Sequence, residues 1–307
     1  MRNKRLLDVA SLALLIPALG LAAYRLSPQF RASVLVIAGR SANCPLRWAV
    51  KSDQMIRNHM ALMNQFIQTS TLVKEEQGLK LWHTQRGDYW MPAGDKDVLM
   101  SLLSEQDHQI YGRGEQGVHP GDIVLDCGAH VGVFTRVALK AGAKLVVAIE
   151  PAPKNLECLR RNLAAEIAAG KVIVFPKGVW EKDGALTFHV DPVNSAGDSM
   201  VFNDRDKREG DIQVPVAAID TLVAELRLPR VDFIKMDIEG SERHAVLGAA
   251  KALRDFRPRM ALCTYHLPDD PVVVPRNVTS IVPDYQFECE TCGEMDSRII
   301  PQALLFH

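Results

Sequence analysis

Short, largely apolar segments recur from residue 120 onward and alternate with stretches of helical periodicity. The apolar segments are residues 123–125, 144–150, 171–176, 231–237 and 259–266. Segments of this kind are typical of strands that are buried on both faces of a parallel sheet. The amphipathic stretches between them are residues 133–142, 153–170 and 241–256. Strand alternating with helix predicts a doubly wound α/β sheet over residues 120–307.

The chain before residue 120 has a different pattern. Residues 29–78 are predicted to be an accessory helical region, because the apolar positions between residues 53 and 67 follow helical spacing. Residues 79–119 contain short alternating runs broken by glycine and proline, which predicts a small hairpin and a helix before the main domain. Within the main domain, residues 191–213 are rich in Asn, Asp, Gly and Ser and are expected to form a long hairpin or a cap loop.

Composition narrows the class of protein. The chain has 307 residues, of which 47% are hydrophobic, and its net charge is -1. A chain of this length can bury a full core. Because proteins that bind nucleic-acid backbones carry a basic excess, we expect no nucleic-acid partner.

The cysteines do not form a recognisable pattern. Six of them, at positions 44, 127, 158, 263, 289 and 292, are too few for a disulfide framework in a chain of this length. The sequence CETC at residues 289–292 has the spacing of half a zinc site, but no second pair of ligands accompanies it. We therefore expect two free thiols near the C-terminus.

Residues 6–26 form an apolar stretch with basic residues on both sides. The first 50 residues contain seven Lys and Arg against one acid, and the longest part without charge, residues 9–24, has 16 residues. A membrane-spanning helix needs roughly 20 apolar residues, and Pro17 weakens a helix here. A transmembrane or surface anchor, a secretory signal and an ordinary helix all stay open. We favour an anchor over residues 1–28 that binds an anionic membrane surface.

The turn after the first predicted strand, LDCGAHVGVF at residues 125–134, carries the candidate chemistry. Ligands of doubly wound sheets bind outside the carboxyl ends of the strands, although a turn without a ligand is the alternative. Asp126 precedes Gly128 by two positions, and Gly132 follows. A carboxylate there would repel a pyrophosphate but suits a cationic amine and sulfonium, which favours S-adenosylmethionine over NAD. Glu150 ends the second strand, where an acid can accept hydrogen bonds from both ribose hydroxyls.

Four stretches resemble the FkbM family of S-adenosylmethionine-dependent methyltransferases. They are VLDCGAHVGVFT (124–135), AIEPAPKNLECLRRNL (148–163), VFPKGVW (174–180) and FIKMDIEGSERHAVLGA (233–249), the last of which is the most specific. The resemblance covers about residues 120–267. It implies a Rossmann-like class I methyltransferase fold, in which a seventh, antiparallel strand lies near the C-terminus. It also implies O-methylation of a hydroxyl group on a sugar, glycolipid or polyketide-like acceptor.

The resemblance also implies which residues bind the cofactor. By position, the turn after the first strand would surround the methionine part, and Glu150 would bind the ribose. The residues concerned are Asp126, Gly128, Ala129, His130, Gly132, Glu150 and Pro151, with Lys177, Gly178 and Val179 near the adenine. His130 departs from the family pattern, in which this position is a small residue or Asn.

Methyl transfer to a hydroxyl needs a group that takes the proton of the acceptor. Asp237 and Glu239 follow the fourth predicted strand and His266 follows the fifth, so each could be this base. A histidine with its ordinary pKa of about 6.5 is the easier proton acceptor at neutral pH. Glu242 is expected only to stabilise the start of its helix. A divalent metal held by Asp237 and Glu239 is not favoured, because no third ligand is evident.

We therefore expect an S-adenosylmethionine-dependent O-methyltransferase at the cytoplasmic face of a membrane, with a soluble cytoplasmic enzyme as the alternative. Two other functions stay open. One is a membrane-tethered binding module that keeps the fold without turnover. The other is an NAD-binding oxidoreductase, which Asp126 disfavours. The acceptor itself is not readable from the sequence.

Overall fold

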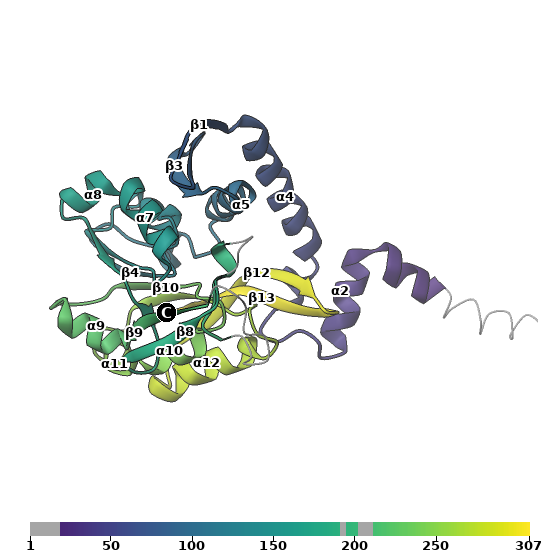
Figure 1. Ribbon diagram of the computed structural model, residues 1–307. Coiled ribbons are helices and arrows are strands. Elements are labelled where there is room, and N and C mark those ends of the chain that lie inside the picture. Colours follow the sequence, from purple (N-terminus) through teal and green to yellow (C-terminus); the bar gives the residue numbers. More distant parts are fainter. Residues whose placement is uncertain (1–18, 191–194, 202–210) are drawn as a thin grey trace, which may run out of the picture.

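The computed structural model describes residues 19–190, 195–201 and 211–307 (Figure 1). Within these residues, a central sheet has seven strands in the order β12-β13-β11-β10-β4-β5-β6. The strands are β4 (Ile123–Cys127), β5 (Leu145–Ile149), β6 (Val172–Phe175), β10 (Phe233–Met236), β11 (Arg259–Cys263), β12 (Phe287–Met295) and β13 (Arg298–Phe306). Strands β4, β5, β6, β10 and β11 run parallel, and β13 is antiparallel to both of its neighbours. The predicted mostly parallel sheet and its antiparallel strand are confirmed.

Helices cover both faces of the central sheet (Figure 1). They are α6 (Val133–Lys140), α7 (Pro153–Asn162) and α8 (Ala164–Ala168) on one face, and α9 (Ile219–Glu225), α10 (Glu242–Leu247), α11 (Ala250–Phe256) and α12 (Asp270–Ile281) on the other. Successive side chains of a strand point to opposite faces. Thus Val124 of β4 packs with Phe134 of α6, whereas Leu125 belongs to the core beneath α9 to α12. This confirms the doubly wound arrangement.

The N-terminal part adds helices and a small antiparallel sheet. Its elements are α2 (Pro28–Ile37), α3 (Leu46–Ala49), α4 (Ser52–Thr69), β1 (Thr71–Glu76), β2 (Leu79–Thr84), β3 (Gly87–Pro92), α5 (Lys96–Asp107) and the 3-10 helix η1 (Gly114–Gln116). The helix over 53–67 and the hairpin of β2 and β3 agree with the predictions, but β1 lies in the region predicted to be helical. All side chains of β1 are exposed, so no alternation of apolar and polar positions marks it as a strand.

The N-terminal sheet is fixed to the part of the main domain that follows β4. Phe66 of α4, Tyr89 of β3 and Val133 of α6 belong to one buried cluster. The Asn162 amide, at the end of α7, accepts from the backbone N–H of Trp90 (2.7 Å) and donates to its carbonyl oxygen (3.0 Å). The turn between β4 and α6 is therefore supported from both parts of the chain.

A further small sheet lies beside the carboxyl end of β6. Its strands are β7 (Gly178–Val179), β8 (Gly184–Phe188) and β9 (Ile212–Ala217), in the order β7-β9-β8. Strands β8 and β9 are antiparallel, so the predicted loop 191–213 connects the two strands of a long hairpin. Residues 191–194 and 202–210 of this loop lie outside the described residues, whereas residues 195–201 are described and include the 3-10 helix η2 (Ser195–Gly197).

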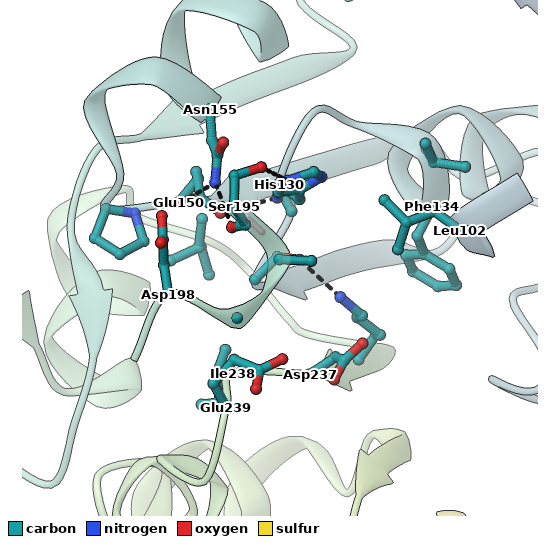
Figure 2. Close-up of a pocket in the computed structure, with 18 of the residues that line it drawn as sticks. Leu102, His130, Phe134, Glu150, Asn155, Ser195, Asp198, Asp237, Ile238 and Glu239 are labelled. Carbon is teal, nitrogen blue, oxygen red and sulfur yellow. Dashed lines mark hydrogen bonds between the residues drawn. The ribbon is translucent and has the colours of Figure 1, made fainter. Parts of the chain in front are cut away.

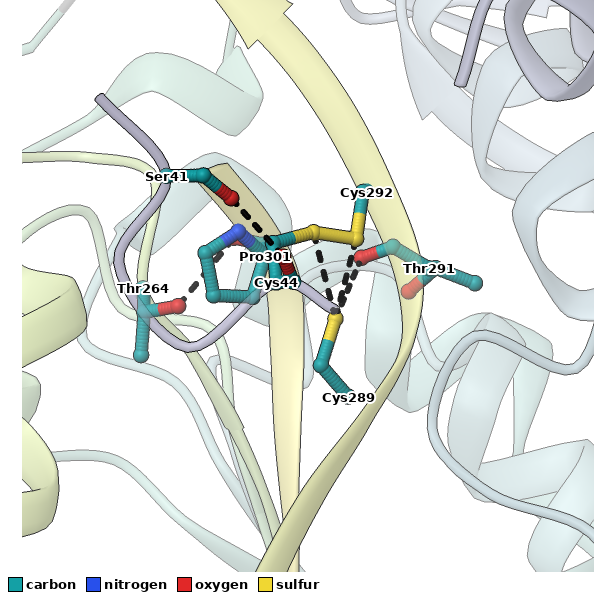
Figure 3. Close-up of a disulfide and its surroundings, with 7 residues drawn as sticks. All are labelled: Ser41, Cys44, Thr264, Cys289, Thr291, Cys292 and Pro301. Carbon is teal, nitrogen blue, oxygen red and sulfur yellow. Dashed lines mark hydrogen bonds between the residues drawn. A yellow bond between two sulfur atoms is a disulfide. The ribbon is translucent and has the colours of Figure 1, made fainter. Parts of the chain in front are cut away.

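The cysteines differ from the prediction. Cys44, between α2 and α3, is joined by a disulfide to Cys292 on β12 (Figure 3). The expectation of two free thiols at CETC is therefore wrong for Cys292, whereas Cys289 is a free, buried thiol. The Sγ atom of Cys289 lies 3.3 Å from that of Cys292. The bonded residues are 248 positions apart in the sequence, so no local spacing indicates their pairing.

Most of the predicted anchor cannot be compared with the structure. Residues 1–18 lie outside the described residues, and residues 19–26 are helical. In the part of the chain that the structure describes, no helix has both the length and the apolar character needed to cross a membrane. The anchor over residues 1–28 therefore stays a prediction.

Candidate active site

A cavity of about 380 Å³ lies at the carboxyl ends of β4, β5 and β10 (Figure 2), and we call it the central cavity. Its walls include residues 128–130 after β4, residues 150–151 after β5 and residues 237–239 after β10. Residues 195–198 of the predicted cap loop also line it. This is the edge of a doubly wound sheet at which ligands bind.

Most of the predicted site residues meet in the central cavity. Those that line it are Gly128, Ala129, His130, Glu150, Pro151, Gly178, Val179, Asp237 and Glu239. Asp126, Gly132, Lys177 and His266 are not part of the lining. Asp126 is fully buried beneath the turn, Gly132 begins α6, and the Lys177 side chain pairs with a glutamate of α9. His266 lies within 3.4 Å of two acids of the cavity wall, Asp237 and Glu239.

Glycine is required at two points of the turn between β4 and α6. Gly128 has a φ of 78°, and a side chain there would overlap the backbone oxygen of Asp237. Gly132 has a φ of 92°, and a side chain there would press on Leu159 of α7. Since L-residues with side chains rarely adopt a positive φ, both positions favour glycine for conformation, and Gly128 also needs it for space. The turn can therefore approach β10 and α7 closely.

Glu150 anchors the turn from the end of β5. Its Oε2 accepts a hydrogen bond from the backbone N–H of His130 (2.9 Å), and its Oε1 accepts one from that of Ala152 (2.9 Å). Burial raises the pKa of Glu150 to about 7, although these hydrogen bonds oppose the change. Each carboxylate oxygen has a second lone pair. Glu150 can therefore accept further hydrogen bonds from a molecule in the central cavity.

His130 and Asn155 present unsatisfied polar atoms next to Glu150 (Figure 2). His130 has a φ of 50°, and its Nε2 is hydrogen-bonded to the Ser195 hydroxyl (2.8 Å). Burial, together with the charge of Lys235, lowers the pKa of His130 to about 3, so the ring is neutral at pH 7. His130 Nδ1 and Asn155 Oδ1 are buried without a hydrogen-bond partner among the described residues. Because buried polar atoms are normally paired, they fit a polar ligand.

Asp126 pairs with a lysine. Lys235 Nζ of β10 lies 3.4 Å from Asp126 Oδ1 and donates hydrogen bonds to the carbonyl oxygens of Cys127 (3.3 Å) and Gly128 (2.8 Å). The other oxygen of Asp126 accepts a hydrogen bond from Thr135 (2.6 Å). Burial would lower the pKa of Lys235, but the adjacent carboxylates outweigh it and raise the pKa. The ion pair with Asp126 therefore positions Lys235, and the hydrogen bonds of Lys235 stabilise the turn after β4.

Three carboxylates surround His266 at the end of β11. Its Nε2 lies 3.3 Å from Asp237 Oδ1 and 3.4 Å from Glu239 Oε1, and its Nδ1 lies 3.1 Å from Glu242 Oε1. Glu242 also accepts a hydrogen bond from the backbone N–H of Ile238 (2.8 Å). Glu242 is fully buried, so it does more than stabilise the start of α10. The sequence offered no evident third ligand for a metal at this site. In the structure, ligand atoms of Asp237, Glu242 and His266 lie within 4.8 Å of one another, so three side chains of a type that can bind a metal meet here.

This environment decides the charge of each group. Burial opposes protonation of His266, but Glu242, Asp237 and Glu239 raise its pKa well above the ordinary value. Burial likewise opposes ionisation of Asp237, yet the adjacent His266 ring and the charge of Lys235 lower its pKa. The pKa of Glu239 is raised, chiefly by desolvation. At neutral pH His266 is therefore an imidazolium and Asp237 a carboxylate. Because His266 is already protonated, it cannot accept the proton of an acceptor hydroxyl.

Several lining residues escaped the sequence analysis. Glu105, Tyr111 and Tyr265 line the central cavity, and the Tyr111 hydroxyl donates a hydrogen bond to Asp237 (2.6 Å). Glu105 and Tyr111 come from the N-terminal part, which carries no motif. Lys235 could have been identified from the sequence, because a lysine inside an apolar, buried strand needs a charged partner and so indicates a buried ion pair.

Comparison with known proteins identifies relatives of this chain. Residues 126–297 match the model of the methyltransferase FkbM domain. The hexuronic acid methyltransferase AglP of Haloferax volcanii is 24% identical over 197 residues, which cover 64% of this chain and 71% of the relative. The 31-O-demethyl-FK506 methyltransferase FkbM of Streptomyces tacrolimicus is 27% identical over 164 residues, which cover 44% of this chain and 62% of the relative.

A solved structure is also similar. The crystal structure of methyltransferase FkbM from Methylobacillus flagellatus KT aligns with 84% of this chain and 60% of its own, at 20% identity and a TM-score of 0.46. The chain therefore spans less than two thirds of this protein and of the Streptomyces relative.

Proposed function

Because this chain belongs to the FkbM methyltransferase family, we propose that it transfers a methyl group from S-adenosylmethionine to a hydroxyl group of a small acceptor. The acceptor class that the sequence suggests is a sugar, a glycolipid or a polyketide-like molecule. The observation that carries the proposal is the buried Glu150 at the end of β5, hydrogen-bonded to the turn after β4 in the same cavity. An acid at this point of a doubly wound sheet can accept hydrogen bonds from both ribose hydroxyls of a nucleoside cofactor.

The side chains of the central cavity fit this cofactor. His130 Nδ1 and Asn155 Oδ1 lack partners and can bond to its polar groups. Asp237 and Glu239 form an acidic wall opposite Glu150 (Figure 2), which suits a cationic sulfonium. When bound, S-adenosylmethionine supplies an electrophilic methyl group. The role predicted for Asp126 becomes indirect, because this residue positions the turn through Lys235.

We assign the proton-accepting role to Glu239. Its side chain lines the central cavity, and its raised pKa makes it a stronger base than an ordinary glutamate. Asp237 is occupied by Tyr111 and His266, and His266 is already protonated. During methyl transfer the proton of the acceptor hydroxyl would pass to Glu239. His266 lies 3.4 Å from Glu239 and orients its carboxylate.

Binding of S-adenosylhomocysteine tests the cofactor assignment. Isothermal titration calorimetry on the full-length protein is expected to give binding by the wild type and none with NAD. Glu150→Ala is expected to weaken the affinity about 10- to 100-fold, which corresponds to the loss of hydrogen bonds to a charged group. Glu115→Ala, which removes an exposed acid of η1 outside the cavity, is the matched control. Absence of heat from the wild type, or unchanged affinity of Glu150→Ala, would overturn the assignment.

Transfer of a radiolabelled methyl group tests the reaction. The protein is incubated with labelled S-adenosylmethionine and with glycolipid and small-molecule extracts of a host that lacks the protein. Glu239→Gln is expected to lower kcat by about 10²- to 10⁴-fold, the usual contribution of a positioned base, while affinity for S-adenosylhomocysteine is retained. Full activity of Glu239→Gln would refute the base assignment and leave the transferase function intact.

A further inference from the structure

A further cavity of about 360 Å³ adjoins the central cavity, and we call it the side cavity. It lies between α4, α5 and the hairpin of β12 and β13. Glu105 and Tyr265 line both cavities, so these two side chains form the wall between them. The Tyr265 hydroxyl is 3.4 Å from Asp237 Oδ1. Tyr265 therefore connects the side cavity to Asp237, which lies on the acidic wall of the central cavity together with Glu239.

Two titratable side chains of the side cavity, Glu105 and His59, favour their uncharged forms at neutral pH. Burial, together with repulsion from Asp237, raises the pKa of Glu105 to about 8. Burial also lowers the pKa of His59, and the neighbouring His108 lowers it further. His59 Nε2 and Glu105 Oε1 lie 3.2 and 3.3 Å from the Ser101 hydroxyl. These groups can donate and accept hydrogen bonds without presenting an ionic charge.

The remaining walls of the side cavity are apolar at the mouth, and the described residues that line it include no lysine or arginine. Ile56 and Met295 line the cavity and are 41% and 47% exposed. The less exposed Ile110 and Ile300 also line it. Glu294, the other acid of the lining, is paired with Arg31 (2.8 Å). An anionic ligand would find no lysine or arginine partner among the described residues of this lining.

The transfer point has an excess of negative charge. Its carboxylates outnumber its cations, since Asp126, Asp237, Glu239 and Glu242 surround Lys235 and His266. Both cations are already paired within the protein. A carboxylate on the acceptor would therefore be desolvated and repelled, and close like charges cost several kcal/mol across an interface.

We propose that the side cavity binds the methyl acceptor, and that this acceptor is an uncharged, hydroxyl-bearing molecule with an apolar body. The inference rests on the proposed function and narrows its acceptor class. It separates this chain from a relative named for hexuronic acid, because a hexuronic acid is anionic at neutral pH. The apolar body would occupy the mouth beside Ile56 and Met295, and the hydroxyl would point past Tyr265 toward Glu239.

A matched pair of glycosides tests the inference. Octyl β-glucoside and octyl β-glucuronide share the sugar ring and the tail and differ in the carboxylate. Each is titrated, below its micelle concentration, into full-length protein saturated with S-adenosylhomocysteine. The glucoside is expected to bind at least about tenfold more tightly than the glucuronide, a difference readily resolved by calorimetry. Equal or tighter binding of the glucuronide, or binding of neither glycoside, overturns the inference.

Variants of the side cavity test the location. Ile300→Trp fills the cavity, and Ile56→Trp narrows its mouth at a half-exposed position where misfolding is not expected. Both are expected to lose glucoside affinity at least about tenfold and to keep affinity for S-adenosylhomocysteine. Val272→Trp, at an exposed position of α12 outside both cavities, is the control.

Different outcomes would contradict the acceptor site and the proposed methyltransferase function. Unchanged glucoside binding by Ile300→Trp and Ile56→Trp, with S-adenosylhomocysteine still bound, overturns the acceptor location and leaves the proposed function standing. Absence of S-adenosylhomocysteine binding by the wild type overturns the proposed function, and the acceptor inference with it.

Discussion

Substitution of Lys235 by methionine is expected to destabilise the protein by about 3–5 kcal/mol, because it leaves a buried carboxylate without its cation. The two side chains are buried almost completely, with exposures of 5% for Lys235 and 0% for Asp126. Methionine has a similar length and fills the space of the lysine stem. The expected loss of stability therefore reports the charge and its hydrogen bonds rather than a cavity.

The magnitude follows from the geometry. Two unit charges at 3.4 Å attract by about 5 kcal/mol at an effective dielectric constant of about 20. Lys235 also donates hydrogen bonds to the carbonyl oxygens of Cys127 and Gly128, whereas Asp126 would keep only Thr135. Because Gly128 O is one of the lost acceptors, the turn should loosen as well. We therefore expect weaker binding of S-adenosylhomocysteine by Lys235→Met.

The interaction energy of Lys235 and Asp126 can be measured by urea unfolding of the wild type, Lys235→Met, Asp126→Asn and the double variant. Removing both charges leaves no unpaired ion, so the double variant should be more stable than Lys235→Met. The midpoint of unfolding is expected to fall while the m-value stays constant. A loss below about 1 kcal/mol in Lys235→Met, or a double variant as unstable as the sum of the single ones, would refute the reasoning.

Two further predictions concern Glu150 and the disulfide. The pKa of Glu150 is raised to about 7, so the protein free of ligand should lose stability as pH rises from about 4.5 to 7. As Glu150 loses its proton, S-adenosylhomocysteine should bind more tightly, because the carboxylate accepts hydrogen bonds from the ribose hydroxyls. Calorimetry between pH 5.5 and 8 should show this rise in affinity in the wild type. An equal rise in Glu150→Gln would contradict the prediction. Cys44→Ser should lower the free energy of unfolding by up to about 5.5 kcal/mol, the chain-entropy value for a loop of this length. Cys289→Ser leaves the disulfide intact, and equal unfolding midpoints of the two variants would argue against a structural role of the bond.

The core of the fold could be predicted from sequence because its signal is local. Strands buried on both faces are apolar without alternation, and β4, β5, β6, β10 and β11 all have this composition. Strand β1 carries no such signal, since it lies at the edge of its sheet with every side chain exposed. Residues that follow strands, such as Glu150 and Asp237, were placed correctly at the cavity because the carboxyl ends of parallel strands meet at one edge.

What the sequence by itself determined about this protein is the order of strands and helices, the glycine turn after β4 and the acids that end β5 and β10. Only the tertiary structure decided what those acids do. Asp126 does not line the cavity and instead pairs with Lys235 of the neighbouring strand. His266 is kept protonated by carboxylates that follow another strand. The side cavity and the bond between Cys44 and Cys292 likewise join distant segments. Periodicity records which face of an element is buried, whereas charge state and partner depend on Coulomb interactions between residues that only the fold brings together.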